Sequence, residues 1–232
     1  MSAQALDTVV VTGASRGLGA HCAMRLHEKG YRVVGLGRNP PRDSLFEMRQ
    51  ADVGDAASVK AALGELRRDS SVYALINAAG IASMNLVITT PSETVRRIIA
   101  TNLLGTIFCC QAIAPALVKR GGGRIINFST LGVQLAISGE AIYIASKAGI
   151  EGFSRTFARE MAPHGVTVNT IAPGPIDTAL VAKIPRESID EVVGRQLIAR
   201  QGEPEDVWNI VSLLLSPESS MITGETLHVG GA

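Results

Sequence analysis

The chain of 232 residues carries 22 Lys+Arg against 21 Asp+Glu, a formal net charge of +1, and 46% of its residues are hydrophobic. This apolar content excludes intrinsic disorder, and the near-neutral charge offers no attraction to nucleic acid or to an anionic membrane, so neither is expected as a partner. No apolar run approaches the ~18 residues that span a bilayer, and residues 1–8 lack a signal-peptide pattern. We therefore expect a cytoplasmic protein with a single domain over residues 1–232.

The cysteines and histidines show no metal-ligand spacing. Cys109 and Cys110 are adjacent, Cys22 lies far from them, and no CxxC pair occurs. The four histidines are likewise scattered along the chain. We expect neither a disulfide framework nor a structural metal.

Short β-rich runs alternate with longer helical ones along the chain. The short runs are almost continuously apolar, which is typical of strands covered on both faces of a parallel sheet. The predicted strands are Thr8–Thr12, Tyr31–Leu36, Val72–Asn77, Arg124–Ser129 and Val166–Ala172. Residues 38–50 contain two adjacent prolines and are too short for a crossover helix, so we predict a loop or a single helical turn there.

The first two predicted helices have clear ends. One covers residues 17–29 and stops at Gly30, a residue that suits a helix C-terminus. The other starts at Thr90, which we expect to form a capping box with Glu93, and runs towards Leu117.

Two further helices are predicted, over residues 142–161 and from Glu203 onwards. Alternating strands and helices indicate right-handed βαβ units. The sequence therefore predicts an α/β fold of the Rossmann type, a doubly wound parallel sheet in a three-layer α/β/α sandwich.

A glycine-rich loop, residues 12–19 (TGASRGLG), links the first predicted strand to the first helix. A pyrophosphate group needs backbone N–H donors at the positive end of a helix, and glycines leave room for its close approach. We therefore expect a dinucleotide at this loop. Its candidate contacts are Gly13, Ser15, Arg16, Leu18 and Gly19.

The charges near the loop indicate which dinucleotide binds. Sites of this type that bind NAD carry a carboxylate at the end of the second strand, where it bonds the ribose 2′-hydroxyl. Here the second predicted strand ends without a carboxylate and is followed by Arg38. A second arginine, Arg16, lies in the glycine loop. Two guanidinium groups suit a 2′-phosphate, so the sequence predicts NADP(H).

Further motifs follow in order along the chain. They are Ala51-Asp52-Val53, Asn77-Ala78-Ala79-Gly80, Asn102, Tyr143-Ile144-Ala145-Ser146-Lys147 and Pro173-Gly174. With the glycine loop they span nearly the whole sequence, which resembles the short-chain dehydrogenase/reductase family and, within it, the 3-oxoacyl-carrier-protein reductases. The resemblance implies NADPH-dependent, reversible reduction of a carbonyl group to an alcohol.

Tyr143 and Lys147 lie four residues apart, hence on one face of a predicted helix. A free tyrosine has a pKa of about 10, and we expect the lysine ammonium and an oxidised nicotinamide to lower it. The resemblance makes Tyr143 the proton donor, places Lys147 also on the nicotinamide ribose, and gives Asn102 a helix kink and a place in a proton relay. A non-catalytic NADP(H) sensor or scaffold is the alternative function, and loss of Tyr143 or Lys147 would be its signature.

Two hydroxyl groups compete for the role of orienting the substrate carbonyl. Members of the family usually place a serine thirteen positions before the tyrosine, where this chain has Thr130. Threonine offers the same donor, although its methyl group narrows the pocket. We expect Thr130 in this role, with Ser129 as the alternative.

The resemblance also places the remaining cofactor contacts. Asp52 and Val53 would hold the adenine, although Asp52 could instead serve as a helix cap or turn residue. The ribose side would be lined by Asn77, Ala78, Ala79 and Gly80. The nicotinamide would be enclosed by Pro173, Gly174, Ile176 and Thr178.

Substrate choice is expected to lie in residues 131–142 and 178–200. Their apolar side chains predict a partly apolar pocket, formed by Leu131, Val133, Leu135, Ile137, Leu180, Val181 and Ile184. An acidic carrier protein would need basic docking residues, for which the candidates are Lys119, Arg120 and Arg124. His164 stands where we expect arginine in reductases that dock such a carrier, so a small free ketone fits equally well.

Two predicted helices carry features of a subunit interface. The helix with Tyr143 has small residues that permit close approach: Ala145, Ala148, Gly149 and Gly152. The preceding helix has more apolar surface than one face of the sheet would cover, from Ile99, Leu103, Ile107 and Cys110. Together with the family resemblance, they predict a homotetramer of two-fold symmetry, with a dimer as the alternative.

Overall fold

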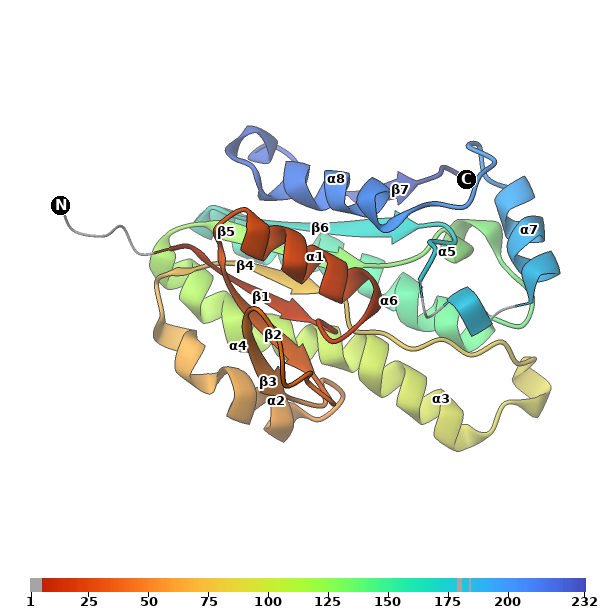
Figure 1. Ribbon diagram of the computed structural model, residues 1–232, viewed down its shortest axis with the longest axis horizontal. Coiled ribbons are helices and arrows are strands. Elements are labelled where there is room, and N and C mark those ends of the chain that lie inside the picture. The colour runs from red at the N-terminus through yellow and green to blue at the C-terminus, as the bar shows by residue number, and fades with distance from the viewer. Residues whose placement is uncertain (1–5, 179–180, 184) are drawn as a thin grey trace.

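A parallel sheet of seven strands runs through the molecule. The computed structural model describes residues 6–178, 181–183 and 185–232. The strand order is β3-β2-β1-β4-β5-β6-β7 (Figure 1). The strands are β1 (Thr8–Thr12), β2 (Arg32–Gly37), β3 (Glu47–Gln50), β4 (Val72–Asn77), β5 (Gly123–Phe128), β6 (Val166–Pro173) and β7 (Thr226–Val229).

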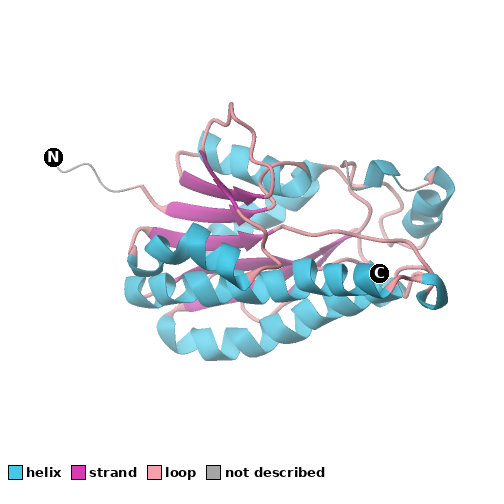
Figure 2. Cartoon of the chain, turned by 90° about the horizontal axis from the view of Figure 1, so that it is seen from below, coloured by secondary structure: helices cyan, strands magenta, loops and turns pink. Residues whose placement is uncertain are grey.

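Helices cover both faces of this sheet, as the view along it in Figure 2 shows. One face packs on α1 (Gly17–Glu28) and α8 (Pro204–Leu215), and the other on α2 (Ala56–Leu63), α4 (Gly105–Arg120) and α6 (Ala141–Met161). The remaining helices are α3 (Ser92–Ile99), α5 (Gly132–Leu135) and α7 (Arg186–Gly194). The predicted Rossmann-type, doubly wound α/β fold is confirmed.

The segment between Arg38 and Gln50 differs from the prediction of a loop or helical turn. Residues 47–50 form β3, which pairs in parallel with β2 at the edge of the sheet. Its sequence, EMRQ, is polar because an edge strand has one strand neighbour and faces water. Arg49 secures it through Glu65, with an Nη2 to Oε1 distance of 2.5 Å. A polar edge strand lacks the continuously apolar run that marks a central parallel strand, so this pattern does not predict β3.

The start of α3 also differs from the prediction. The Thr90 hydroxyl donates to the carbonyl oxygen of Leu86 at 2.8 Å, whereas the helix begins at Ser92 after Pro91. The capping box expected between Thr90 and Glu93 is therefore wrong, because the preceding turn engages the threonine side chain.

A π-helical turn, Ala100–Leu104, joins α3 to α4 around Asn102. The hydroxyl of Thr106 donates to the Asn102 carbonyl oxygen at 2.8 Å, which satisfies a backbone group in the widened turn. The structure has a π-helical turn where the kink is expected, and the Asn102 side chain there reaches Ser146 on α6.

The continuous helical stretch Ser92–Arg120 has 29 residues, and an 18-residue window within it has a mean hydropathy of 1.6, enough by length and composition to cross a membrane. The sequence reading found no such run. Its inward side chains, which include Cys109, Ile113 and Leu117, are fully buried against the sheet. The stretch is therefore a core helix of the α/β fold.

Candidate active site

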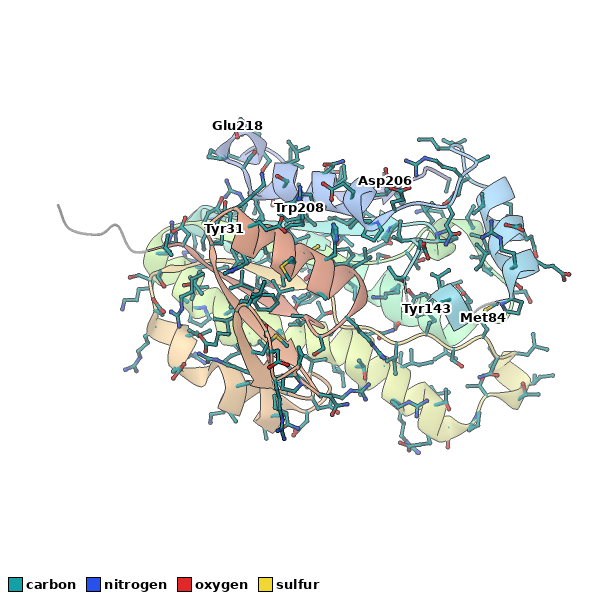
Figure 3. All side chains as sticks on the ribbon, in the orientation of Figure 1. Tyr31, Met84, Tyr143, Asp206, Trp208 and Glu218 are labelled. Atoms are coloured by element: carbon teal, nitrogen blue, oxygen red, sulfur yellow. The ribbon has the colours of Figure 1, made fainter. Side chains whose placement is uncertain are left out.

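A cavity of about 580 Å³ lies at the carboxyl ends of the strands, beside the place where the strand order reverses around β1. The glycine loop forms one end, and the residues after β5, the start of α6 and α7 form the other. Figure 3 shows Tyr143 and Met84, which line this second end, near each other beside α6. Among the predicted site residues, Asn77 and Asn102 stand outside the cavity lining, and the others line it.

Close packing fixes the glycine loop against the end of β4. Gly13 has a φ of +70°, and a β-carbon there would lie 2.9 Å from the Cα atom of Ala79. The Ala79 N–H donates to the Thr12 hydroxyl at 3.0 Å. Arg16, the N-cap residue of α1, makes no side-chain capping hydrogen bond. The loop therefore presents the N-terminal N–H groups of α1 to the cavity, as a pyrophosphate site requires.

Positive charge and a buried hydroxyl group meet at the end of β2. The guanidinium groups of Arg16 and Arg38 are exposed, and neither forms an ion pair with any described residue. The Ser15 Oγ atom is buried beside Gly37 and lacks a hydrogen-bond partner within the described part of the chain. This donor set fits a phosphate group on the adenosine ribose.

Asp52 has a structural task in addition to its place in the cavity wall. Its Oδ1 atom accepts a hydrogen bond from the Gly54 N–H at 2.9 Å, which closes a turn. The helix cap is Asp55, whose carboxylate accepts from the N–H groups of Ala57 and Ser58. Asp52 is thus a turn residue, and an adenine contact by Asp52 and the buried Val53 stays a prediction.

Asn77 does not line the cavity, although we expect it on the side where the cofactor ribose would lie. Its Nδ2 atom donates to Asn127 Oδ1 at 2.9 Å, and Asn127 in turn donates to Ser154 at 2.8 Å. This buried chain links β4, β5 and α6 beneath the cavity. Asn77 therefore stabilises the strands that carry the site.

Thr130, Tyr143 and Lys147 converge at the second end of the cavity. Thr130 follows β5, while Tyr143 and Lys147 lie on the first turns of α6. The Lys147 Nζ atom donates to the Phe128 carbonyl oxygen at 2.8 Å and lies 5.8 Å from the centre of the Tyr143 ring. The Thr130 side chain lies close enough to the Tyr143 phenol to lower its pKa, against the effect of burial. This arrangement can hold a substrate oxygen between two hydroxyl groups, with a cation behind them.

Ser129 directs its hydroxyl group elsewhere. Its Oγ atom donates to Glu151 Oε1 at 2.5 Å, and both side chains are buried. The serine therefore ties the end of β5 to α6. The geometry favours Thr130 over Ser129 as the residue beside the substrate carbonyl.

The pKa of Tyr143 is raised, in the direction opposite to the expected one. Burial contributes most, the Glu140 carboxylate adds to it, and the hydrogen bond with Thr130 acts the other way. The ammonium of Lys147 is bonded to the Phe128 carbonyl and does not outweigh the loss of solvation. At neutral pH the phenol therefore holds its proton, which is the form required of a proton donor.

Burial lowers the pKa of Lys147 to about 8, which predicts an alkaline limit to activity. The ammonium is charged below that pH and loses its proton above it, whereas the Tyr143 phenol, with a raised pKa, stays protonated. We expect kcat/KM for carbonyl reduction to fall as pH rises past about 8. Lys147→Arg keeps the charge at every accessible pH and should remove this fall. The same alkaline fall in the arginine variant would contradict the assignment.

Asn102 positions the loop that follows β4. Its amide donates to the Ile81 carbonyl oxygen and accepts from the Ile81 N–H, both at 2.9 Å. It also donates to the Ser146 hydroxyl on α6 at 3.0 Å. Asn102 thus holds Ile81, a cavity residue, against α6, and its place in a proton relay stays a prediction.

The segment after β6 closes the cavity over the predicted nicotinamide position. The Pro173 carbonyl oxygen accepts a hydrogen bond from the Leu131 N–H at 2.9 Å, and Ile176 forms an isolated parallel β-bridge with Gly202. Of the predicted apolar pocket residues, Leu131, Ile137 and Val181 line the cavity, whereas Val133 and Leu135 do not. Leu180 and Ile184 lie outside the described residues.

Several cavity residues were not singled out from the sequence: Asn39 and Ile81, and also Glu140 and Glu191, which lie within the segments expected to determine substrate choice. Asn39 could have been suspected from its place next to Arg38, and Ile81 from its place next to Gly80. Glu140 lies three residues before Tyr143, one helical turn away, and that spacing was the available signal.

Comparisons with known proteins show which family the chain belongs to. A family model described as enoyl-(acyl carrier protein) reductase matches residues 13–231. The 3-oxoacyl-[acyl-carrier-protein] reductase FabG of Staphylococcus aureus is 35% identical, with 97% of this chain and 96% of the relative covered. The enzyme of the same name from Escherichia coli K12 is 36% identical, with 96% and 95% covered.

Two solved structures share the fold along nearly their whole length. The aldohexose dehydrogenase of Thermoplasma acidophilum superposes with a TM-score of 0.88 at 28% identity, covering 97% of this chain and 93% of that one. A structure described as a putative betaketoacyl-ACP reductase gives 0.85 at 33% identity, covering 97% and 96%. Fold and site define an oxidoreductase of the kind that uses NAD(P)(H). The chain belongs to the short-chain dehydrogenase/reductase family and is similar to its FabG-type ketoreductases.

Proposed function

We propose that this protein is an NADPH-dependent carbonyl reductase, reversible as an alcohol dehydrogenase. The observation that carries the proposal is the layout of one cavity. Tyr143, Lys147 and Thr130 meet at one end of it, and the glycine loop with Arg16 and Arg38 forms the other.

Each of these residues has a defined task in reduction. NADPH, when bound, would supply the hydride. The hydroxyl groups of Thr130 and Tyr143 donate hydrogen bonds to the substrate carbonyl oxygen, and Tyr143 transfers its proton to that oxygen as the carbinol forms. The Lys147 ammonium then stabilises the tyrosinate until a proton returns.

The candidate docking residues for an acidic carrier protein are engaged within the chain. Arg120 pairs with Asp7 at 2.8 Å, Lys119 donates to the Arg68 carbonyl oxygen at 2.8 Å, and Arg124 is buried. We therefore propose a small free carbonyl compound as the substrate, with action in the cytoplasm. Turnover of a ketone panel beside a 3-oxoacyl thioester, the substrate class in the FabG relatives' name, tests this choice.

Arg38→Asp is expected to shift cofactor preference from NADPH towards NADH. The substitution removes one phosphate partner and introduces a repelling charge at the same place. A hydrogen bond to a charged group contributes ~1.5–3 kcal/mol, so the ratio of kcat/KM for the two cofactors should change at least about tenfold. Arg42→Asp, the same change in the exposed loop that follows, is the control. Equal kcat/KM for NADPH and NADH in the parent protein would refute the NADPH assignment.

We also propose a homotetramer of two-fold symmetry. Ala145, Ala148 and Gly152 are exposed along α6, and a β-carbon at Gly152 would meet no described atom within 4 Å. Phe153 and Phe157 stack beside this strip, with ring centres 5.2 Å apart. Cys110, which we had expected at the interface, is fully buried within the subunit. Light scattering should give four times the chain mass of 24.3 kDa, and a monomer mass would contradict the proposal.

A further inference from the structure

The two ends of the cavity carry opposite charge. Arg16 and Arg38 lie at the end formed by the glycine loop. At the other end, where the substrate would bind, the wall includes two carboxylates, Glu140 before α6 and Glu191 on α7. The described cation in that wall, Lys147, donates to the Phe128 carbonyl oxygen and belongs to the catalytic group. The carboxylates are therefore not neutralised there by a described side chain.

Glu140 is the carboxylate that lies beside the catalytic hydroxyl groups. Both Glu140 Oε2 and Thr130 Oγ1 lie beside Gly132. A β-carbon added to Gly132 would be 3.3 Å from the first oxygen and 3.4 Å from the second, so the two oxygens are near neighbours. Glu140 also lies close enough to Tyr143 for its charge to raise the pKa of the phenol. A substrate whose carbonyl oxygen sits on Thr130 and Tyr143 therefore brings its neighbouring carbon atoms to Glu140.

No contact among the described residues explains the position of the Glu140 carboxylate. Glu140 is the N-cap residue of α6, yet it makes no capping hydrogen bond. Its carboxylate has no hydrogen-bond or ion-pair partner among the described residues, and burial raises its pKa. A partly desolvated carboxylate is costly unless a donor satisfies it, and the cavity is where a donor would enter.

We infer that Glu140 is a specificity-determining residue of the proposed reaction. Its carboxylate accepts a hydrogen bond from a hydroxyl group carried on the second carbon from the substrate carbonyl, and it repels substrates that have a carboxylate at that position. The substrate class is then a neutral hydroxy ketone or hydroxy aldehyde. This inference rests on the proposed function and adds the chemistry that the pocket selects.

Substrate pairs of matched shape test the inference. The first pair is 4-hydroxy-2-butanone and 2-pentanone, in which the hydroxyl group of the first compound replaces a methyl group of the second. The second pair is acetoacetate and its methyl ester, of which only acetoacetate carries a negative charge. We expect the parent protein to prefer the hydroxy ketone and the ester, each by about tenfold in kcat/KM, the effect of a hydrogen bond or repulsion that involves a charge. The preference should lie in KM, because the contact forms in the ground state.

Glu140→Gln removes the charge at nearly the same shape and should reduce both preferences to about threefold or less. Glu160→Gln makes the same change at the exposed far end of α6 and should keep both preferences. If Glu140→Gln slows both members of each pair equally, or the parent protein favours 2-pentanone or acetoacetate, the inference is overturned while the proposed function stands. Failure of the parent protein to oxidise NADPH with any of these ketones overturns the proposed function and the inference with it.

Discussion

Tyr143→Phe is expected to lower kcat for carbonyl reduction by about 10²–10⁴-fold, the usual contribution of a general acid. In the proposed reaction the phenol donates the proton to the substrate oxygen, and its raised pKa keeps it protonated at neutral pH. The ring itself remains in the variant, so the packing around it is preserved. NADPH binding, followed by cofactor fluorescence, should change little.

Tyr31→Phe supplies the matched control for this experiment. Tyr31 lies just before β2, stacked on Tyr73 and far from Tyr143 in Figure 3. The control should keep parental kcat and parental NADPH binding. Comparable kcat values for Tyr143→Phe and Tyr31→Phe would remove the tyrosine from the mechanism.

Thr130→Val should lower turnover by about 10²–10³-fold, as expected when one donor to the reacting oxygen is removed. Valine keeps the shape of threonine, so the loss reports on the Thr130 hydroxyl group, which lies beside Tyr143 in the cavity. Cofactor affinity should remain at the parental value, because Thr130 lies at the substrate end of the cavity.

Ser129→Ala separates stability from catalysis. The Ser129 hydroxyl donates to the buried Glu151 carboxylate, so its removal leaves that carboxylate short of a donor. We expect the free energy of unfolding to fall by ~1–3 kcal/mol, with kcat close to that of the parent protein. If Ser129→Ala loses turnover and Thr130→Val keeps it, the carbonyl-orienting role belongs to Ser129.

The parts of the site that local motifs encode were predictable from the sequence. The glycine loop and the pair Tyr143 and Lys147 each lie within one turn or one helix, so their spacing alone places them together. The central strands β1 and β4 were predicted with the observed bounds because they are continuously apolar. Local pattern thus predicted the fold class and the glycine loop, whereas the family resemblance supplied most of the other predicted residues of the cavity wall.

Properties that depend on tertiary packing were not predictable in the same way. The strand β3 is polar because it lies at an edge, and that position is set by the sheet as a whole. The upward shift in the pKa of Tyr143 arises from burial and from Glu140, neither of which its spacing to Lys147 reveals. Asn77 turns to Asn127 on a strand 50 residues away, so its motif could not show that it leaves the cavity.

Hydride transfer to a carbonyl carbon is the central claim, and isotope labelling tests it most directly. The parent protein is incubated with 4-hydroxy-2-butanone and NADPH that carries deuterium at C4 of the nicotinamide, with each of the two C4 positions labelled in turn. We predict that one labelled form, and not the other, yields an alcohol with deuterium on the new carbinol carbon, and that Tyr143→Phe yields almost none. NADPH that binds while no deuterium reaches any ketone of the panel, from either labelled form, would contradict the account and identify a binding protein.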